Sequence, residues 1–507
     1  AVRGYAPEQR LAGSRKTSRC RRLARTQWEM GAMRFCWTKI HTWVSLPLAV
    51  WFCVQPAFAQ DLLQNEVGAS ARLQPSAAAD CPEAPGSKRP LLPYELGFQV
   101  TFIDQQLFKF HSPYQGPHSL VSRNENELSD TYTLFAGVRV APPVEIYVNP
   151  EMARGNGLSQ SLGLAGITNG DVIRNPSLGM DPYLARYFAR LTIPTGRGTE
   201  PVAAGENQIV EKRPTNRLVI TSGKLATTDI FDLNSYANST RTQFMNWALI
   251  NNAAYDYAAD TRGYSQGLAV EWIHPTWAIR AGAYKMPNAA NGPHLSGDLI
   301  HNRGDQAEME LRLHALPRKS PLITRWLVYR NFGYMGSYRE ALQIAQATGE
   351  APDITSAKHR GSVKYGAGLN FEQALGDDGA TGIFGRFGWN DGATESFVFT
   401  EADRTISLGA QIAGSKWGRK TDRFALAIVQ NDLSRLHKEY LAAGGLGFLL
   451  GDGRLNNGSE RVIESYYTWQ LGPSIGISLD GQYITNPGYN RDRGPVTVVS
   501  ARVHWEM

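Results

Sequence analysis

Apolar and polar side chains alternate with a period of two along most of the chain from Tyr94 to Met507. In the final segment, one face carries Thr497, Val499, Ala501, Val503, Trp505 and Met507. Because successive side chains of a β-strand point to opposite faces, this pattern predicts strands with one apolar face. A soluble β-sandwich also has half-buried strands, so alternation alone does not decide the environment.

About sixteen segments show the alternation, an even number of the kind that single-chain bacterial outer-membrane barrels use. Their approximate ranges are 94–102, 131–140, 144–149, 183–193, 217–224, 264–273, 277–285, 305–315, 322–331, 362–371, 382–390, 405–413, 423–430, 461–470, 475–484 and 496–507. Outer-membrane barrels characteristically close with an amphipathic strand that ends in an aromatic or apolar residue. Phe is commonest at that end, so Met507 is a departure.

The links between these segments alternate in length. Short links at 141–143, 274–276, 316–321, 414–422 and 472–474 interleave with long ones at 103–130, 150–182, 225–263, 332–361 and 431–460. Short periplasmic turns, long extracellular loops and aromatic residues at the membrane interfaces are typical of outer-membrane barrels. Trp272 and Trp277 flank one short link, and Trp469 precedes another. Only the link 194–216 breaks the rule, which puts a strand boundary there in question. The chain is therefore predicted to be all-β, a transmembrane antiparallel β-barrel of about 16 strands.

The N-terminal residues lack the alternation and divide into three segments. Residues 33–59 have a basic start, an apolar core and an Ala-Phe-Ala cleavage signature, which predicts a signal peptide with Gln60 as the new N-terminus. The Arg-rich residues 1–32 are expected to be a non-native or over-called extension, and a genuine unusual extension is the alternative. Residues 60–90 are rich in Ala, Pro and Ser and are expected to be flexible, and residues 91–507 form the barrel domain.

The charge of the chain is concentrated in its leader. Residues 1–59 hold ten Lys or Arg and two Glu, so the formal +6 of the whole chain becomes −2 for the remainder. A nucleic-acid partner is therefore not expected. Only Cys81 lies outside the leader, and no Cys/His spacing resembles a zinc site. No stretch reaches the ~20 apolar residues that a membrane-spanning helix needs.

Six blocks of sequence resemble the carbohydrate-selective outer-membrane porin family over essentially all of residues 90–507. They are Gly166-Ile167-Thr168-Asn169-Gly170, residues 229–232 with 241–249, residues 335–342, Gly388-Trp389-Asn390-Asp391-Gly392, residues 440–448 and residues 489–496. The resemblance implies a sixteen-stranded barrel that lets glucose and related sugars diffuse passively across the outer membrane of a Gram-negative bacterium. The expected partners are small neutral sugars, outer-membrane lipid and lipopolysaccharide, and the barrel-assembly machinery, which would meet the C-terminal strand.

The alternation of side chains along each strand predicts which residues line the lumen. In 183–193, Tyr183, Ala185 and Tyr187 would face lipid, which places Arg186, Phe188 and Arg190 inside. On later strands, the same alternation predicts that the following residues face the lumen: Arg280, Glu308, Glu310, Arg312, Arg386, Glu464 and Asp480. Arg or Lys on the lipid side would cost about 2–4 kcal/mol each near the midplane. The plainer alternative is that these charges solvate the wall and pair across strands.

The long link 225–263 is the candidate constriction loop. It contains Asp229, Asp232, Arg241, Asn246 and Trp247, a mixture that can hydrogen-bond hydroxyls and stack on a sugar ring. An ordinary extracellular loop packed on its neighbours is the alternative.

Two other functions compete with sugar uptake. An outer-membrane hydrolase would need a nucleophile beside a His, and Glu308, Glu310 and His314 come without a nucleophile motif. A polysaccharide-export or adhesion barrel would carry a lumen of a single charge sign, whereas the predicted lining is mixed. The chain is predicted not to be an enzyme and to use no cofactor or metal.

Overall fold

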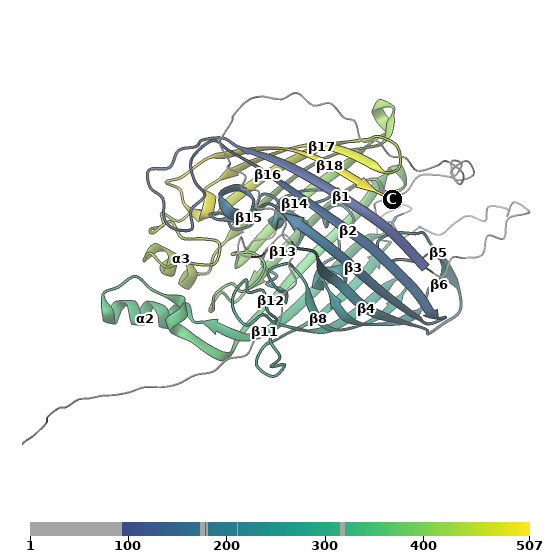
Figure 1. The fold of residues 1–507 in the computed structure, drawn as a ribbon, viewed down its shortest axis with the longest axis horizontal. Coiled ribbons are helices and arrows are strands. Elements are labelled where there is room, and N and C mark those ends of the chain that lie inside the picture. The colour runs from purple at the N-terminus through teal and green to yellow at the C-terminus, as the bar shows by residue number, and fades with distance from the viewer. Residues whose placement is uncertain (1–93, 173–177, 179–180, 210, 315–319) are drawn as a thin grey trace, which may run out of the picture. The chain divides into compact units, whose positions relative to one another are not determined.

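The computed structural model describes residues 94–172, 178, 181–209, 211–314 and 320–507, all within one compact unit. The segments expected at 1–32, 33–59 and 60–90 lie outside these residues. Within the described chain, sixteen strands form one closed antiparallel barrel (Figure 1). They are β1 (Tyr94–Leu107), β2 (Glu125–Ala141), β3 (Val144–Arg154), β4 (Tyr183–Pro194), β7 (Arg217–Leu225), β8 (Ser265–His274), β9 (Trp277–Lys285), β10 (Arg303–Leu313), β11 (Leu322–Gly336), β12 (Lys358–Gly376), β13 (Thr381–Asn390), β14 (Arg404–Gly414), β15 (Arg419–Asp432), β16 (Glu460–Gln470), β17 (Ile475–Thr485) and β18 (Val496–Glu506). Each corresponds to one of the predicted segments, so the predicted fold is confirmed.

Each strand pairs with its neighbours in sequence, except where β4 pairs with β7 and where β1 pairs with β18 to close the barrel. The closing pair aligns Gln99 with Glu506, and Phe98 and Met507 exchange two backbone hydrogen bonds beyond it. The barrel thus begins and ends at the same rim, together with the short turns. Since periplasmic turns are short and extracellular loops long in such barrels, we call this rim the periplasmic end.

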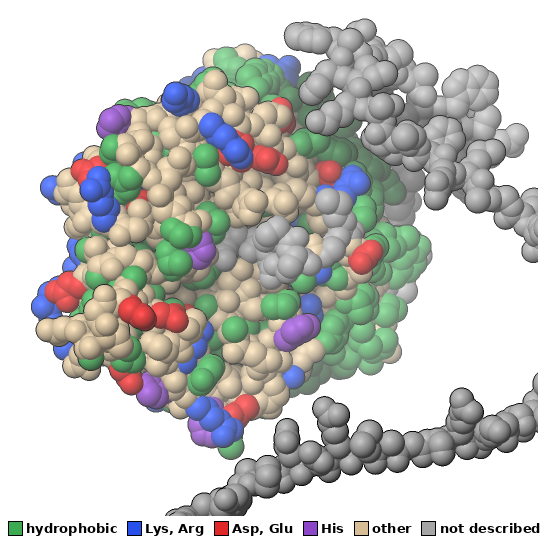
Figure 2. All heavy atoms as spheres, turned by 60° about the vertical axis from the view of Figure 1, so that its left-hand side comes forward, with side chains coloured by type: hydrophobic (Ala, Val, Ile, Leu, Met, Phe, Trp, Pro, Cys, Tyr) green, Lys and Arg blue, Asp and Glu red, His purple; other side chains and the backbone are tan. Residues whose placement is uncertain are grey.

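The two faces of the wall differ as the alternation predicts. Leu479, Val499 and Val503 are exposed on the outside, whereas Asp480 and Arg502 on the same strands are buried inside. Figure 2 looks toward the loop end, where charged side chains are scattered among polar ones, and a band of hydrophobic side chains recedes behind it. Apolar side chains face outward because the outer face of the barrel contacts lipid hydrocarbon in place of water.

Aromatic side chains gather next to the short turns. The rings of Trp272 and Trp277 lie 5.2 Å apart on either side of the turn between β8 and β9. Trp469, near the end of β16, lies 4.7 Å from Tyr467. These positions fit an interfacial aromatic belt at the periplasmic end.

The link 194–216 is long for a periplasmic turn because it contains its own two-stranded hairpin. Strands β5 (Thr199–Val202) and β6 (Glu211–Pro214) pair with each other and not with the barrel. The strand boundaries on either side of the link are therefore correct. We call residues 199–214 the periplasmic hairpin.

The expected lipid-facing positions of Tyr183 and Ala185 are wrong. Register shifts between β3 and β4, with Asn149 opposite Arg186 but Pro150 opposite Leu184, so Ala185 is an extra residue. This bulge reverses the parity at the start of β4, as β-bulges do. Tyr183 and Ala185 are consequently packed against Tyr264, while the parity after the bulge is as predicted.

The loops that the structure describes contain three short helices, α1 (Trp247–Ile250), α2 (Tyr338–Thr348) and α3 (Arg435–Ala442), with α2 and α3 at the loop end in Figure 1. Six short 3-10 helices accompany them in the described chain: Leu158–Ser161, Thr227–Asp229, Ile354–Ala357, Asp377–Gly379, Ser415–Trp417 and Pro487–Tyr489. No helix among the described residues has both the length and the apolar character needed to cross a membrane.

Candidate functional site

Residues 226–264, between β7 and β8, fold into the barrel, and we call them the constriction loop. Carboxylates on the inner wall accept hydrogen bonds from its backbone. Glu308 on β10 accepts from the N–H of Asp232 at 2.7 Å. Glu464 on β16 accepts from the N–H groups of Met245 and Asn246. Because these strands lie on different parts of the wall, the loop is tied across the lumen.

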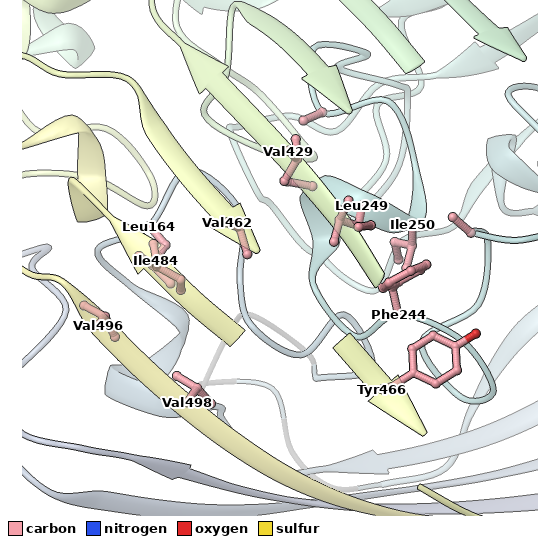
Figure 3. Packing of buried hydrophobic residues seen from close by; sticks show 14 of the residues in the cluster. Leu164, Phe244, Leu249, Ile250, Val429, Val462, Tyr466, Ile484, Val496 and Val498 are labelled. Carbon is pink, nitrogen blue, oxygen red and sulfur yellow. The ribbon is translucent and has the colours of Figure 1, made fainter. Parts of the chain in front are cut away.

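Apolar packing also holds the constriction loop against the wall. Phe244, Leu249 and Ile250 of the loop belong to one buried cluster with wall residues of β15 to β18 (Figure 3). The ring of Phe244 meets that of Tyr466 edge-on at 5.0 Å. Burying apolar side chains inside the barrel fixes the loop in place, at about 25 cal/mol per Å² of apolar surface removed from water.

Two wall arginines complete the attachment of the loop. Arg386 on β13 lies 3.0 Å from Asp232 and donates to the carbonyls of Leu249 and Ala237. Arg502 on β18 donates to the carbonyls of Thr240 and Gln243. Both guanidinium groups are buried and satisfy loop groups that would otherwise lack partners.

A second inward segment supports the constriction loop from residues 163–172. Trp247 donates its backbone N–H to Ile167, and Gly170 donates to Met245. A Cβ at Gly170 would lie 2.2 Å from the Trp247 ring, so this close approach requires glycine. The sequence block 166–170 is thus a packing partner of helix α1.

The wall charges of β9 to β12 form a buried ladder. Arg280 lies 3.0 Å from Glu308 and 3.1 Å from Glu310, and Arg312 lies 2.6 Å from Glu310. Arg325 extends the ladder from Glu310 to Glu372 on β12. The plainer alternative from the sequence, pairing across strands, therefore describes Arg280, Glu308, Glu310 and Arg312.

The remaining buried candidates also have protein partners. Asn246 caps helix α1 and donates to Gln482 on β17 at 3.0 Å. Asp480 accepts from Gln482. Trp247 stacks on Phe399, with ring centroids 5.1 Å apart. These contacts place Asn246 and Asp480 in the packing between loop and wall, and Trp247 against the loop that joins β13 to β14.

Arg241 ties the constriction loop to the opposite side of the barrel. Its guanidinium lies 2.9 Å from Glu151 on β3 and 2.8 Å from Asp171. Glu151 also accepts hydrogen bonds from the hydroxyls of Tyr183 and Tyr264. The Arg241 guanidinium also donates to the Thr133 hydroxyl at 2.9 Å, so three partners hold a nearly buried group whose first role is to position the loop.

The charges that keep the most exposure among the interior candidates lie beside β4. Arg186 binds Asp229 through both its Nε and Nη2 atoms at 2.8 Å. The side chains of Arg190 and Asp229 remain 29% and 28% exposed, against 5% or less for Arg280, Glu308 and Arg386. This part of the lumen is where a solute can meet charged groups of the chain.

Aromatic rings flank these groups. Phe188 stacks on Tyr147 with centroids 5.0 Å apart, and the Arg190 guanidinium lies 5.1 Å from the Tyr147 centroid. The Arg186 guanidinium lies 5.2 Å from the Tyr264 centroid. Arginine held over aromatic faces keeps its planar donor fork oriented.

The sequence did not nominate the residues of the periplasmic hairpin that reach this region. Glu206 lies 3.2 Å from Arg186, and Arg190 donates to the Asn207 carbonyl at 3.0 Å. Glu211 lies 2.7 Å from Arg139 on β2. Burial raises the pKa of the Glu211 carboxyl, and the Glu145 carboxylate raises it further, against the effect of Arg139. The length of link 194–216, with three Glu residues in it, was the available signal.

In the described part of the chain, no group of three or more His, Cys, Asp and Glu side chains is arranged to hold a metal ion. Glu308 and Glu310 are occupied by arginines, and His314 is exposed after the end of β10. The acid–base arrangement considered from the sequence is therefore not assembled among these residues.

Comparison with models of known families identifies the family of this chain. The family model described as carbohydrate-selective porin, OprB family, matches residues 132–507. The solved structure "High pH structure of Pseudomonas putida OprB" is 15% identical, with 82% of this chain and 94% of that chain covered and a TM-score of 0.60. The anion-selective porin from Comamonas acidovorans is 9% identical, with coverage of 82% and 99% and a TM-score of 0.45. The comparison with curated proteins found no match. The chain belongs to the carbohydrate-selective porin family, OprB type, whose members are channels of the Gram-negative outer membrane.

Proposed function

We propose that this protein mediates passive diffusion of small neutral sugars, glucose among them, into the periplasm. The observation that carries the proposal is the balanced set of charges that stays accessible beside β4. There the guanidinium group of Arg186 lies next to the carboxylates of Asp229 and Glu206, and that of Arg190 lies 3.6 Å from Glu145. Pore-lining donors and acceptors of this kind can replace the water around a solute as it passes.

The chemistry of sugars fits this lining. A sugar is a neutral polyol, so each hydroxyl both donates and accepts, and paired cations and carboxylates serve both roles. The rings of Tyr147, Phe188 and Tyr264 are buried, so they orient the guanidinium groups that a sugar meets and do not face the sugar themselves. The electric fields of closely paired opposite charges cancel at longer distances. An ion of either sign is therefore attracted less strongly than an oppositely charged ion would be by a lumen of a single charge sign.

This mixed lining also weighs against the two rivals. A barrel that exports a charged polymer would need one charge sign along its lumen, whereas guanidinium and carboxylate groups alternate here. A hydrolase would need an assembled nucleophile and base, and the described Glu308, Glu310 and His314 do not form one.

We expect liposomes that contain the purified protein to swell in isotonic glucose at several times the rate seen with a neutral tetrasaccharide. The physical reason is that a sugar must fit the space between the constriction loop and the wall and then be released. Dextran-retaining swelling assays with a matched series of neutral sugars provide the measurement. Equal rates for all sugar sizes, or rates equal to those of empty liposomes, would contradict the proposed function.

The remaining partners are also proposals. The outward apolar face would contact outer-membrane lipid and lipopolysaccharide, and β18 would be the segment that the barrel-assembly machinery receives. Cleavage of residues 33–59 by signal peptidase stays a prediction, and the N-terminal residue of the mature protein, expected to be Gln60, tests it.

A further inference from the structure

The periplasmic hairpin folds into the barrel at its periplasmic end. Ile209 is buried in a cluster with Tyr147 and Phe188, which belong to the inner faces of β3 and β4. The backbone N–H of Asn207 donates at 2.9 Å to Glu95, near the start of β1. Contacts with β1, β3 and β4 place the tip of the hairpin, residues 203–209, inside the lumen.

Ion pairs fasten the hairpin along its length. Arg139 of β2 joins Glu211 to Glu145, at 2.7 and 2.9 Å. At its base, Glu200 lies 2.9 Å from Arg217 of β7. The hairpin is thus anchored to five of the barrel strands, β1, β2, β3, β4 and β7, which a loosely tethered surface turn would not be.

The tip of the hairpin meets the constriction loop at a single guanidinium. Arg186 holds Asp229 of the constriction loop through Nε and Nη2, and Glu206 of the hairpin lies 3.2 Å from its Nη1. The Glu206 side chain is 40% exposed, the largest value in this group. An extracellular loop and a periplasmic turn therefore approach each other inside the barrel, with an accessible carboxylate between them.

We propose that the periplasmic hairpin is a second constriction, in series with the constriction loop, and that Glu206 sets the preference against anions there. A solute that passes Asp229 then meets the hairpin tip before it reaches the periplasm. The carboxylate of Glu206 repels anions at short range, and the bulk of residues 203–209 limits the size of what passes. The part of this inference that concerns sugars rests on the proposed function, whereas the part that concerns ions does not.

Shortening the hairpin tests the size limit. Val202 pairs directly with Glu211, so the eight residues between them can be replaced by Asn-Gly, which favours a two-residue hairpin turn. We expect the single-channel conductance in KCl to rise about twofold or more, because the narrowest part of a pore limits conduction. We also expect the swelling rate with a neutral trisaccharide, relative to glucose, to increase. Conductance equal to that of the parent protein would overturn the second constriction.

A substitution that leaves the fold intact tests the charge. In Glu206→Gln, Arg186 keeps its two bonds to Asp229, so the lumen retains its shape. We expect the anion-to-cation permeability ratio, from reversal potentials in a KCl gradient, to rise about threefold. Glu350→Gln, an exposed carboxylate after α2, is the matched control and should leave the ratio unchanged. A Glu206→Gln ratio equal to that of the control would refute the role of Glu206.

The two readouts separate this inference from the proposed function. KCl conductance and ion selectivity report on the hairpin even if no sugar is transported. Failure of glucose to enter liposomes with the parent protein would contradict sugar uptake but leave the second constriction standing. Changes in sugar flux without changes in ion conductance would contradict the second constriction alone.

Discussion

Replacing Arg386 with methionine is expected to free the constriction loop and raise the single-channel conductance severalfold. The guanidinium now lies 3.0 Å from Asp232 and donates to the carbonyls of Leu249 and Ala237. Removing one partner of a buried ion pair costs about 3–5 kcal/mol, because the other charge stays buried without compensation. The closed barrel does not depend on this pair, so the loop is what should move. Planar-bilayer recordings would show larger and noisier currents.

Arg404→Met is the matched control for this prediction. Arg404 is exposed at the beginning of β14, at the loop end of the barrel, and its loss should leave the conductance as in the parent protein. Heat-modifiable migration in gels would show that both barrels have assembled. An assembled Arg386→Met barrel with parental conductance would mean that Arg386 does not hold the constriction.

Arg190→Ala is expected to weaken glucose binding in the lumen by about tenfold or more. Arg190 is the most exposed of the nominated interior cations, and it lies over the rings of Tyr147 and Phe188. A hydrogen bond from a charged donor contributes about 1.5–3 kcal/mol to binding. Since about 1.4 kcal/mol corresponds to a tenfold change in affinity, its loss should weaken binding at least tenfold. The measurement is the glucose concentration that reduces the ion current by half. Conductance without glucose should rise, since the substitution removes bulk.

Two further variants sharpen this test. Arg190→Lys keeps the charge but loses the planar fork, so it should fall between the parent protein and Arg190→Ala. Arg330→Ala removes an exposed arginine from the outer end of β11 and should change nothing. Equal half-blocking concentrations for the parent protein and Arg190→Ala would show that sugars do not use this side chain.

The strands could be predicted from the sequence because the membrane imposes the alternation directly. Each outward side chain meets hydrocarbon, and each inward one meets polar groups, so the period of two survives along the whole wall. The ends were less well defined: β12 extends to Lys358–Gly376, beyond the predicted 362–371. Near the rims both faces are wet, so the pattern fades there.

Local irregularities could not be predicted from the alternation. The bulge at Ala185 turns Tyr183 inward, and only the pairing with β3 reveals it. The sequence of the β5–β6 hairpin lacks a clear alternation of apolar and polar residues. A long link there could therefore not be distinguished from a misplaced boundary of a barrel strand. Its role depends on contacts with Glu95 and Arg186, which are distant in the sequence.

The candidate site was predicted as a set of inward-facing residues. In the structure, most of these residues are bound to other parts of the chain. Parity cannot tell whether an inward charge meets water or another segment. Arg280 is covered by its pairing with Glu308, and Glu464 is covered by the constriction loop, which crosses the lumen. Arg190 stays accessible because that loop leaves part of β4 uncovered. This asymmetry is a tertiary property of residues 226–264.

The most direct test of the whole account is the effect of glucose on the ion current through a single channel of the parent protein. If sugars and ions share the path beside β4, added glucose should reduce the current in a saturable manner, while an uncharged polymer too large to enter should not. A current that glucose leaves unchanged at every concentration would contradict the account.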